Sequence, residues 1–314
     1  MITASLRLAR KAALPVVAAG LAACMSQAIP QATAGPEPAA ADAVNPTGSW
    51  QQTADLGGIP LQVFGYRPSG CAVSAVLLVF HGLDRNAGPY RDDAIPLAQR
   101  YCMLVVAPLF DEARFPTWRY QRGGIIHDGA VQPAANWTVT LVPHLAEWAR
   151  ERAGRPDLPY ALLGHSAGAQ FLSRVAAFGQ GGAMRIVIAN PSTWVEPTLD
   201  VAAPYGLGGV YGPAQGEAAL RRYLALPITV LLGRADTGSH NLATSEEAEE
   251  QGSTRFERGH KVFRDAELAA RQRGWAFNWH LAVVPGVGHS ARQMFTSDAA
   301  SDALQPGTYQ TQAH

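Results

Sequence analysis

The sequence predicts an α/β fold in which a mainly parallel sheet carries helices on both faces. Short, continuously apolar runs such as Ala75–Phe80 have the composition of strands that are buried on both faces of a parallel sheet. These runs alternate with longer segments whose apolar residues recur at helical spacing. A third observation is the turn Gly164-His165-Ser166-Ala167-Gly168, which joins one such run to one such helix.

Composition and charge are those of an ordinary globular protein. Of 314 residues, 47% are hydrophobic and 16% are charged, which is enough apolar material to bury a sizeable core. The formal net charge is zero and no long basic run occurs, so we expect no nucleic-acid partner. The nine histidines are scattered and no Cys/His cluster has metal-ligand spacing, so we expect no metal site.

The first 24 residues have the pattern of an export signal. Three basic residues precede an apolar run over 12–23, which is too short to span a bilayer. The run ends in Leu-Ala-Ala-Cys24, which resembles the bacterial lipobox, where the cysteine is lipidated and becomes the first residue of the mature chain. In the alternative, an ordinary secretory signal is cut near residues 32–34 and Cys24 is discarded. Both interpretations predict export, to the periplasm, to a membrane anchor or to the medium.

Domain organisation beyond the signal is simple. Residues 25–48 are rich in Ala, Pro, Gln and Gly without an apolar period, which predicts a disordered tether. A single folded domain is expected over 49–314, because no internal repeat and no second zone of composition appears.

Seven apolar runs predict strands. Most are continuous, as expected in a parallel sheet, whereas the first alternates weakly and an antiparallel direction is one option for it. In chain order, the expected strands cover residues 61–66, 75–80, 103–107, 158–163, 185–189, 228–232 and 279–284.

Segments with apolar residues at helical spacing lie between the strands. In chain order, the expected helices cover residues 90–101, 137–152, 170–177, 256–273 and 291–300. Pro96 must kink or split the first helix, since proline removes a backbone donor. Two irregular regions, 110–136 and 192–226, are placed over the carboxyl edge of the sheet, where ligands bind in open α/β folds.

The turn at 164–168 predicts a nucleophile, Ser166, exposed on a strained strand-to-helix turn; in the alternative, this serine only caps the helix. A serine nucleophile needs a base, and the base needs a carboxylate partner. His289 and Asp236 each follow the end of a strand and are our candidates. The alternatives for them are a surface histidine and an exposed turn aspartate. The order Ser166, Asp236, His289 is that of the α/β-hydrolase triad.

A tetrahedral intermediate also needs two N–H donors for its oxyanion. The amide of Ala167, directly after the nucleophile, is the first candidate. The amide of Leu83 is the second, because Gly82 supplies a turn after the 75–80 strand. His81 and His165 are expected to be structural.

These motifs resemble those of exported α/β-hydrolases in the group of polyhydroxybutyrate depolymerases, feruloyl esterases and related serine esterases. The resemblance covers residues 50–300 and rests on His81-Gly82, the 164–168 turn, Asp236 and Gly288-His289. It implies an α/β-hydrolase fold and a reaction without metal or organic cofactor. Some relatives of the depolymerases hydrolyse poly(aspartic acid), so the resemblance also allows an amide substrate.

Arginines and aromatic residues in the irregular regions and helix starts are candidates for substrate binding. The arginines would recognise a carboxylate, as in a hydroxy-acid oligomer, or are ordinary surface charge. They are Arg85, Arg91, Arg119 and Arg122. The aromatic residues would line an acyl or polymer groove, or would pack the loops into a small core. They are Trp118, Tyr120, Trp194 and Tyr205.

Cys71 and Cys102 lie before neighbouring parallel strands, at the same end of each. In an exported protein this placement predicts a disulfide, and two free buried thiols are the alternative.

Hydrolysis of a carboxylic ester, small or oligomeric, is therefore the expected reaction. Hydrolysis of an amide such as poly(aspartic acid) comes second. From a different class, a non-catalytic envelope lipoprotein could use a hydrolase scaffold to bind a ligand. Contact with a membrane is expected only through a lipid anchor at Cys24.

Overall fold

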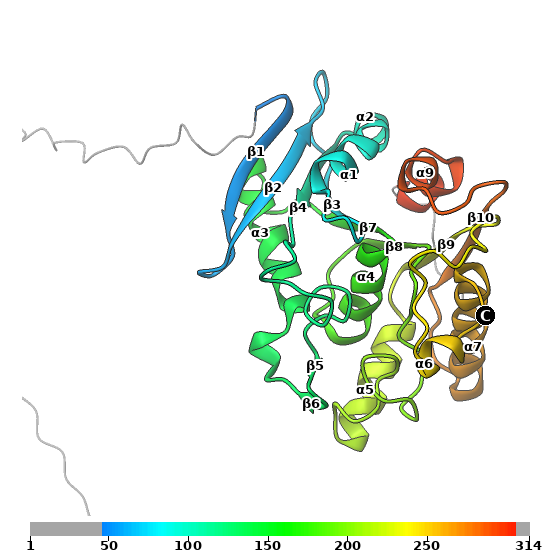
Figure 1. Cartoon of the computed structure of the whole chain (residues 1–314). Helices are drawn as coiled ribbons and strands as arrows, with labels where there is room; N and C mark the ends of the chain where they lie inside the picture. The colour runs from blue at the N-terminus through cyan, green and yellow to red at the C-terminus, as the bar shows by residue number, and fades with distance from the viewer. Residues whose placement is uncertain (1–45, 306–314) are drawn as a thin grey trace, which may run out of the picture. The chain divides into compact units, whose positions relative to one another are not determined.

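The computed structural model describes residues 46–305 (Figure 1). The expected signal peptide with Cys24, most of the expected tether and residues 306–314 lie outside the described residues. The described fold begins with strand β1, Gly48–Asp55.

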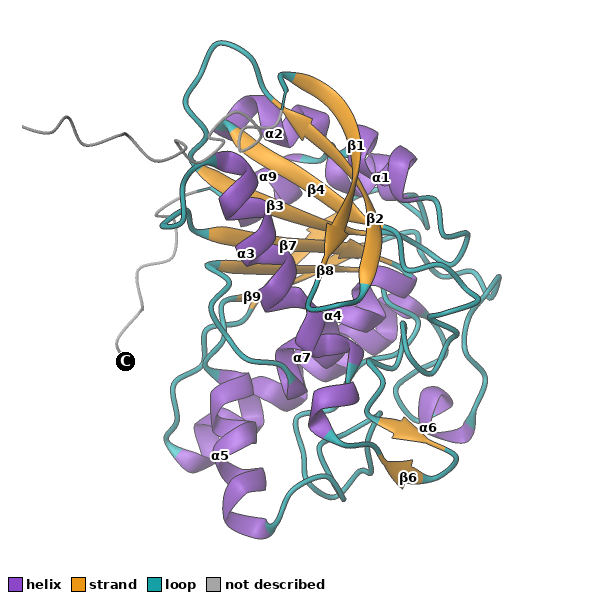
Figure 2. Cartoon of the chain, turned by 90° about the vertical axis from the view of Figure 1, so that its left-hand side faces the viewer, coloured by secondary structure: helices purple, strands orange, loops and turns teal. Residues whose placement is uncertain are grey.

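The centre of the fold is an eight-stranded sheet with the order β1-β2-β4-β3-β7-β8-β9-β10. β1 and β2 pair antiparallel, as do β2 and β4, and the remaining neighbours are parallel. Figure 2 shows the sheet from the side on which β1 and β2 form its edge. After β1 the strands are β2 (Pro60–Arg67), β3 (Ala75–Phe80), β4 (Met103–Pro108), β7 (Tyr160–His165), β8 (Arg185–Ala189), β9 (Ile228–Gly233) and β10 (His280–Val284). The predicted fold class is confirmed, and this is an α/β-hydrolase fold.

The number of buried residues in each strand explains whether the sequence predicted it. Every residue of β3, β4, β7 and β9 is buried, which requires the continuous apolar runs seen in the sequence. β1 was not predicted, because it is polar and buries only Trp50 and Ala54. It is an edge strand held by antiparallel pairing with β2 and by the Trp50 ring, which packs against Gly65.

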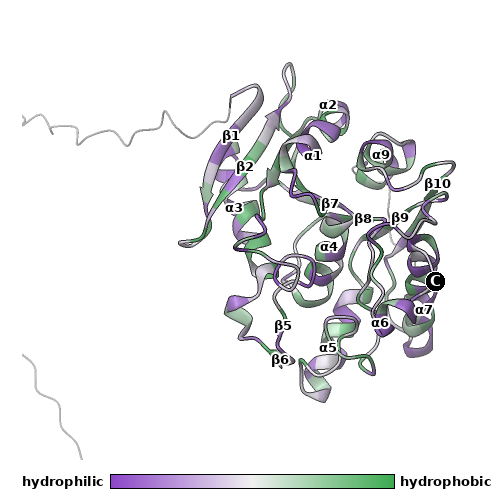
Figure 3. Ribbon diagram, viewed as in Figure 1, coloured by the Kyte–Doolittle hydropathy of each residue, from purple (hydrophilic) through white to green (hydrophobic). Residues whose placement is uncertain are grey.

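Two hydrophobic clusters cover the two faces of the sheet. Alternate residues of β3 divide between them: Val76, Leu78 and Phe80 face one cluster, and Leu77 and Val79 face the other. The first face is covered by α3 (Leu141–Ala153), α4 (Ala167–Phe178), α5 (Pro213–Leu224) and α7 (Arg255–Arg273). The second face is covered by α1 (Ala87–Asp93), α2 (Ile95–Tyr101), α8 (Ala291–Phe295) and α9 (Asp298–Leu304). These helices carry both hydrophobic and hydrophilic residues (Figure 3), as one-sided burial requires.

Several expected boundaries differ from the structure. The helix expected over 90–101 is split into α1 and α2, with Pro96 in the first turn of α2. The helix expected over 291–300 is likewise two helices, α8 and α9, and α3 begins at Leu141 after two short 3-10 turns at Ala134–Asn136 and Thr138–Thr140. The region 192–226 was wrongly expected to be irregular throughout, because it contains α5.

Smaller elements lie in the long connections. Region 110–136 contains a short hairpin of β5 (Ile126–His127) and β6 (Ala130–Val131). One short helix, α6 (Glu246–Glu249), precedes α7. Among the helices of residues 46–305, none is long and apolar enough to cross a membrane.

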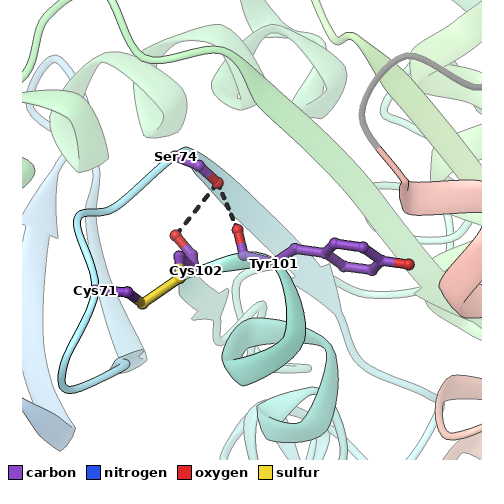
Figure 4. Close-up of a disulfide and its surroundings, with 4 residues drawn as sticks. All are labelled: Cys71, Ser74, Tyr101 and Cys102. Carbon is purple, nitrogen blue, oxygen red and sulfur yellow. Dashed lines mark hydrogen bonds between the residues drawn. A yellow bond between two sulfur atoms is a disulfide. The ribbon is translucent and has the colours of Figure 1, made fainter.

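The predicted disulfide between Cys71 and Cys102 is confirmed, with Cα atoms 6.1 Å apart (Figure 4). Cys102 ends α2 in a left-handed backbone conformation, and its carbonyl accepts from the Ser74 amide at 2.8 Å. The disulfide therefore ties the segments that enter β3 and β4 at their amino ends.

Candidate active site

The predicted nucleophile lies on a strained turn between β7 and α4. Ser166 has φ 56° and ψ −116°, a conformation that residues with a side chain rarely adopt. A Cβ at Gly164 would lie 2.7 Å from the Gly168 carbonyl oxygen, and a Cβ at Gly168 would overlap the Phe80 carbonyl. The two glycines are therefore required for α4 to approach β7 and β3 this closely.

His289 and Asp236 converge on this serine. Nε2 of His289 is 3.0 Å from Oγ of Ser166, and Nδ1 is 2.7 Å from Oδ2 of Asp236. Asp236 follows β9 and its side chain is 1% exposed, whereas His289 lies on the exposed loop after β10 with its side chain 28% exposed. The structure thus brings together three side chains that the sequence separates by up to 123 residues.

Hydrogen bonds hold the two loops that carry Asp236 and His289 together. The Ala235 amide donates to the Val287 carbonyl at 2.9 Å. Asn190, fully buried after β8, accepts from the Gly233 amide at 2.8 Å and donates to the Gly288 carbonyl at 3.4 Å. Asn190 was not among our candidates. Its one signal in the sequence is a polar residue at the carboxyl end of a buried strand.

Asp236 has a second partner that sequence reasoning missed. Nη1 of Arg255, the first residue of α7, is 3.5 Å from Oδ1 of Asp236, and the Arg255 side chain is also 1% exposed. Its guanidinium donates to the carbonyls of Gly238 at 3.4 Å and His240 at 2.7 Å. Burial lowers the pKa of Arg255, and the charge of Asp236 opposes this shift. No motif in the sequence marks this arginine.

The loop after β3 is built on a buried histidine. Nδ1 of His81 lies 2.9 Å from the Gly82 carbonyl, and Nε2 accepts from the Phe110 amide at 3.1 Å. Tyr120 donates to the His81 carbonyl at 2.8 Å. Burial lowers the pKa of His81 from 6.5 to about 4, so the ring is neutral at pH 7. His81 supports the loop from beneath, as a structural residue would.

The two amides expected to hold an oxyanion are free to donate. Ala167 is the first residue of α4, so its N–H has no acceptor within the helix. Leu83 lies on the loop after β3 and is 42% exposed. Within residues 46–305, neither backbone N–H has a hydrogen-bond acceptor.

Two of the expected substrate residues are used elsewhere. Trp194 is 0% exposed, and its backbone is hydrogen-bonded to the Gln251 side chain, so it belongs to the core rather than to a groove. Arg91 on α1 donates to the Gly65 carbonyl at 2.7 Å and pairs with Asp92. It ties α1 to β2.

Other expected residues also support loops. Arg85 donates to the Phe110 carbonyl at 2.8 Å and lies over the Tyr120 ring, 4.8 Å from its centroid. Arg122 donates to the Tyr205 hydroxyl at 3.2 Å. Tyr120 and Tyr205 are both buried, which agrees with the packing alternative for the aromatic residues.

Arg119 and Trp118 line a pocket of about 300 Å³ between the β1–β2 turn and the segment before α3. Trp118 stacks on His127, and the Arg119 guanidinium lies over Phe115, 4.9 Å from the ring centroid. Ile59, Gln132, Ala135, Asn136, Trp137, Thr138, Thr140 and Leu141 complete the lining. Among residues 46–305, no carboxylate forms an ion pair with Arg119. In the same part of the chain, no cluster of His, Cys, Asp and Glu could hold a metal ion.

Two solved structures cover most of this chain at more than 30% identity. The poly(3-hydroxybutyrate) depolymerase LpqC from Bordetella parapertussis is 33% identical, with a TM-score of 0.74, over 82% of this chain and 89% of its own. Poly(aspartic acid) hydrolase-1 from Sphingomonas sp. KT-1 is 32% identical, with a TM-score of 0.74, over 79% of this chain and 96% of its own.

A more distant structure shares the fold. A putative dienelactone hydrolase from Klebsiella pneumoniae is 17% identical, with a TM-score of 0.51, over 82% of this chain and 95% of its own. No family model matches the chain, and no curated protein matches it.

The fold and the strained serine turn define an α/β hydrolase. Within that superfamily, the chain belongs to the group that contains the Bordetella depolymerase and the Sphingomonas poly(aspartic acid) hydrolase.

Proposed function

We propose that the protein is a serine hydrolase that cleaves a carboxylic ester through an acyl-enzyme. The observation that carries the proposal is the continuous set of contacts from Ser166 Oγ through His289 to Asp236, at 3.0 and 2.7 Å. Serine is a poor nucleophile at neutral pH unless a base removes its proton, and a histidine 3.0 Å from the hydroxyl supports such a step.

In the proposed mechanism, Ser166 attacks the ester carbonyl while Nε2 of His289 takes its proton. The tetrahedral oxyanion accepts hydrogen bonds from the amides of Leu83 and Ala167. His289 then gives the proton to the departing alcohol oxygen, and the acyl group stays on Ser166. Water, deprotonated by His289, releases the acid and restores the serine.

Asp236 supports the base in two ways. Its Oδ2 accepts from Nδ1 of His289, so the unprotonated Nε2 of neutral His289 faces the serine. Its negative charge stabilises the imidazolium that forms during the reaction. Because Asp236 is buried, this interaction is weakly screened by water.

Labelling with a fluorophosphonate tests the nucleophile directly. We expect the wild-type protein to be labelled at Ser166 and to hydrolyse p-nitrophenyl esters, and the Ser166→Ala variant to do neither while it keeps its fold. Ser253→Ala removes an exposed serine that the proposed mechanism does not use and is the matched control. Esterase activity in Ser166→Ala equal to that of the control would contradict the mechanism. Absence of labelling in the wild type would favour a binding lipoprotein on a hydrolase scaffold.

Amide hydrolysis is the second candidate, because poly(aspartic acid) hydrolase-1 is 32% identical over most of this chain. The pocket with Arg119 supports an oligomer that carries carboxylates, since no described carboxylate pairs with this guanidinium. A panel of p-nitrophenyl esters, hydroxybutyrate oligomers, a feruloyl ester and poly(aspartic acid) separates the candidates. Release of acid from poly(aspartic acid) faster than from the esters would favour the amide reaction.

We also propose that the protein is exported and anchored by lipid at Cys24. The disulfide supports export, because disulfides persist in oxidising compartments. Radiolabelled palmitate should enter the wild-type protein and not the Cys24→Ser variant when both are expressed in bacteria. Equal labelling of the two would rule out this anchor.

A further inference from the structure

Tyr90 lies where three segments of the site meet. It belongs to α1, and its hydroxyl is 3.2 Å from Nδ1 of His165, the residue directly before the nucleophile. A Cβ at Gly82 would lie 2.5 Å from the same oxygen, so the loop after β3 packs against it. The Tyr90 ring meets Phe295 edge to face, with centroids 5.9 Å apart. Phe295 lies in α8, the helix that follows His289.

The Tyr90 hydroxyl can donate one hydrogen bond, and the groups around it determine which atom accepts that bond. Burial raises the pKa of Tyr90 well above its usual value, so the hydroxyl stays protonated. The Gly82 backbone packs against this oxygen and acts in the opposite direction on its pKa. The protonated hydroxyl has a hydrogen to donate, and Nδ1 of His165 lies within hydrogen-bond distance of it. With Nδ1 as the acceptor, neutral His165 carries its own proton on Nε2.

The neutral His165 ring lies beside the ring of His289. The two ring centroids are 4.5 Å apart, at an interplanar angle of 38°. Burial, followed by the positive charges of His289 and Arg255, holds the pKa of His165 well below its usual range. Its Nε2 atom is buried without a partner among the described residues. The Tyr90 hydroxyl is thus the polar group that sets the orientation of this ring.

We propose that Tyr90 and His165 form a positioning pair for the base. The hydrogen bond from the Tyr90 hydroxyl holds the His165 ring in the orientation against which the His289 ring rests. A neutral ring is needed at this place, because a second cation beside His289 would oppose proton transfer to it. The inference rests on the proposed function, since it gives the pair a part in that reaction. Neither residue is assigned a contact with the substrate.

The test compares two tyrosines that each lose one buried hydroxyl. Tyr90→Phe keeps the ring packed against Phe295 and removes the hydrogen bond to His165. Tyr223→Phe is the matched control. Tyr223 lies in α5 and is also buried, and its hydroxyl donates to the Val195 carbonyl at 3.0 Å. For a p-nitrophenyl ester, we expect kcat of Tyr90→Phe to fall about tenfold, a part of the ~10²–10⁴ that a positioned base contributes. KM should stay unchanged, since no substrate contact is lost.

The rate of fluorophosphonate labelling should fall together with kcat in Tyr90→Phe, because both depend on proton removal by His289. In the control, both rates should equal those of the wild type. The proposal is overturned if Tyr90→Phe matches Tyr223→Phe in kcat and labelling rate, or if its loss lies in KM alone.

A second measurement does not depend on catalysis or on the variant. Nitrogen-15 NMR of the wild-type protein reports which nitrogen of His165 carries the proton. We expect protonated Nε2 and unprotonated Nδ1, and the opposite tautomer would overturn the proposal. If the wild type shows neither esterase activity nor labelling, the proposed function fails. The tautomer then still decides whether Tyr90 donates to His165.

Discussion

Arg255 gives the buried carboxylate of Asp236 a partner for the oxygen that His289 does not use. An unpaired buried carboxylate is costly, and a guanidinium 3.5 Å away offsets part of that cost. The same guanidinium holds the carbonyls of Gly238 and His240, so it also fixes the path of the chain after Asp236. A charge and a loop are thus stabilised by one side chain.

We predict that Arg255→Met lowers both stability and kcat. Removing one partner of a buried ion pair costs about 3–5 kcal/mol, which urea unfolding would measure. Arg258→Met is the matched control, because Arg258 is equally buried in α7 but donates to backbone carbonyls rather than to a carboxylate. The control should lose stability and keep kcat. Equal kcat in the two variants would mean that Arg255 acts on folding alone.

Residues at strand ends could be predicted from the sequence, and residues that support them could not. The convergence of Ser166, Asp236 and His289 could be predicted because each follows a strand, and parallel strands bring their carboxyl ends to one edge. Arg255 acts through a contact across the fold and has no local motif, and Asn190, although it follows β8 directly, has a side chain that is not typical of a catalytic role. Trp194 was misplaced because a tryptophan in a loop has the same sequence pattern whether it lines a groove or fills a core.

At the scale of elements, the disulfide and the candidate site lie at opposite ends of the strands, the disulfide at the amino ends and the site at the carboxyl ends. Cys71 and Cys102 precede β3 and β4, whereas the site residues follow the carboxyl ends of β3, β7, β9 and β10. The bond therefore constrains the fold without contacting the chemistry.

We predict that the double variant Cys71→Ser/Cys102→Ser is less stable and keeps the wild-type kcat. A bond between residues 31 apart in the sequence stabilises by about 4 kcal/mol through the entropy of the unfolded chain. Thermal unfolding of wild type and variant, with and without reductant, measures the loss. A variant that is as stable as the wild type, or a reductant that lowers the stability of the variant as much, would contradict this prediction.

Elements with strong apolar patterns were predicted well, and those with mixed patterns were not. β3, β4, β7, β8 and β9 lie within a residue or two of their expected bounds, since full burial demands continuous apolar runs. β1 was missed because an edge strand buries few residues. The signal for α5 was present, as Leu220, Tyr223 and Leu224 are buried at helical spacing, but the glycines and prolines around it obscured the pattern.

At the scale of the whole molecule, buried histidines make the fold sensitive to acid. The pKa of His81 falls from 6.5 to about 4 on folding, because burial disfavours the charged ring. Between these values the unfolded chain binds a proton that the folded protein does not. The free energy of unfolding must therefore fall as the pH is lowered through this window. His165 shifts in the same direction.

We predict a loss of about 3 kcal/mol from His81 alone when the pH is lowered from 7 to about 4. Urea unfolding at several pH values measures the slope. His81→Gln should flatten part of it, although it lowers stability at pH 7. His144→Gln, which removes an exposed histidine, is the control for the loss of a histidine at the surface. A slope in His81→Gln equal to that of the wild type would assign the acid sensitivity to other groups.

The long chain separation between the three candidate catalytic residues also bears on when the protein acquires activity. Ser166 and His289 are 123 residues apart, and His289 lies in the last tenth of the chain. A growing chain in which residue 289 has not yet been synthesised holds a serine without its proposed base. In the proposed hydrolase, esterase activity is therefore expected to arise only when the fold is complete.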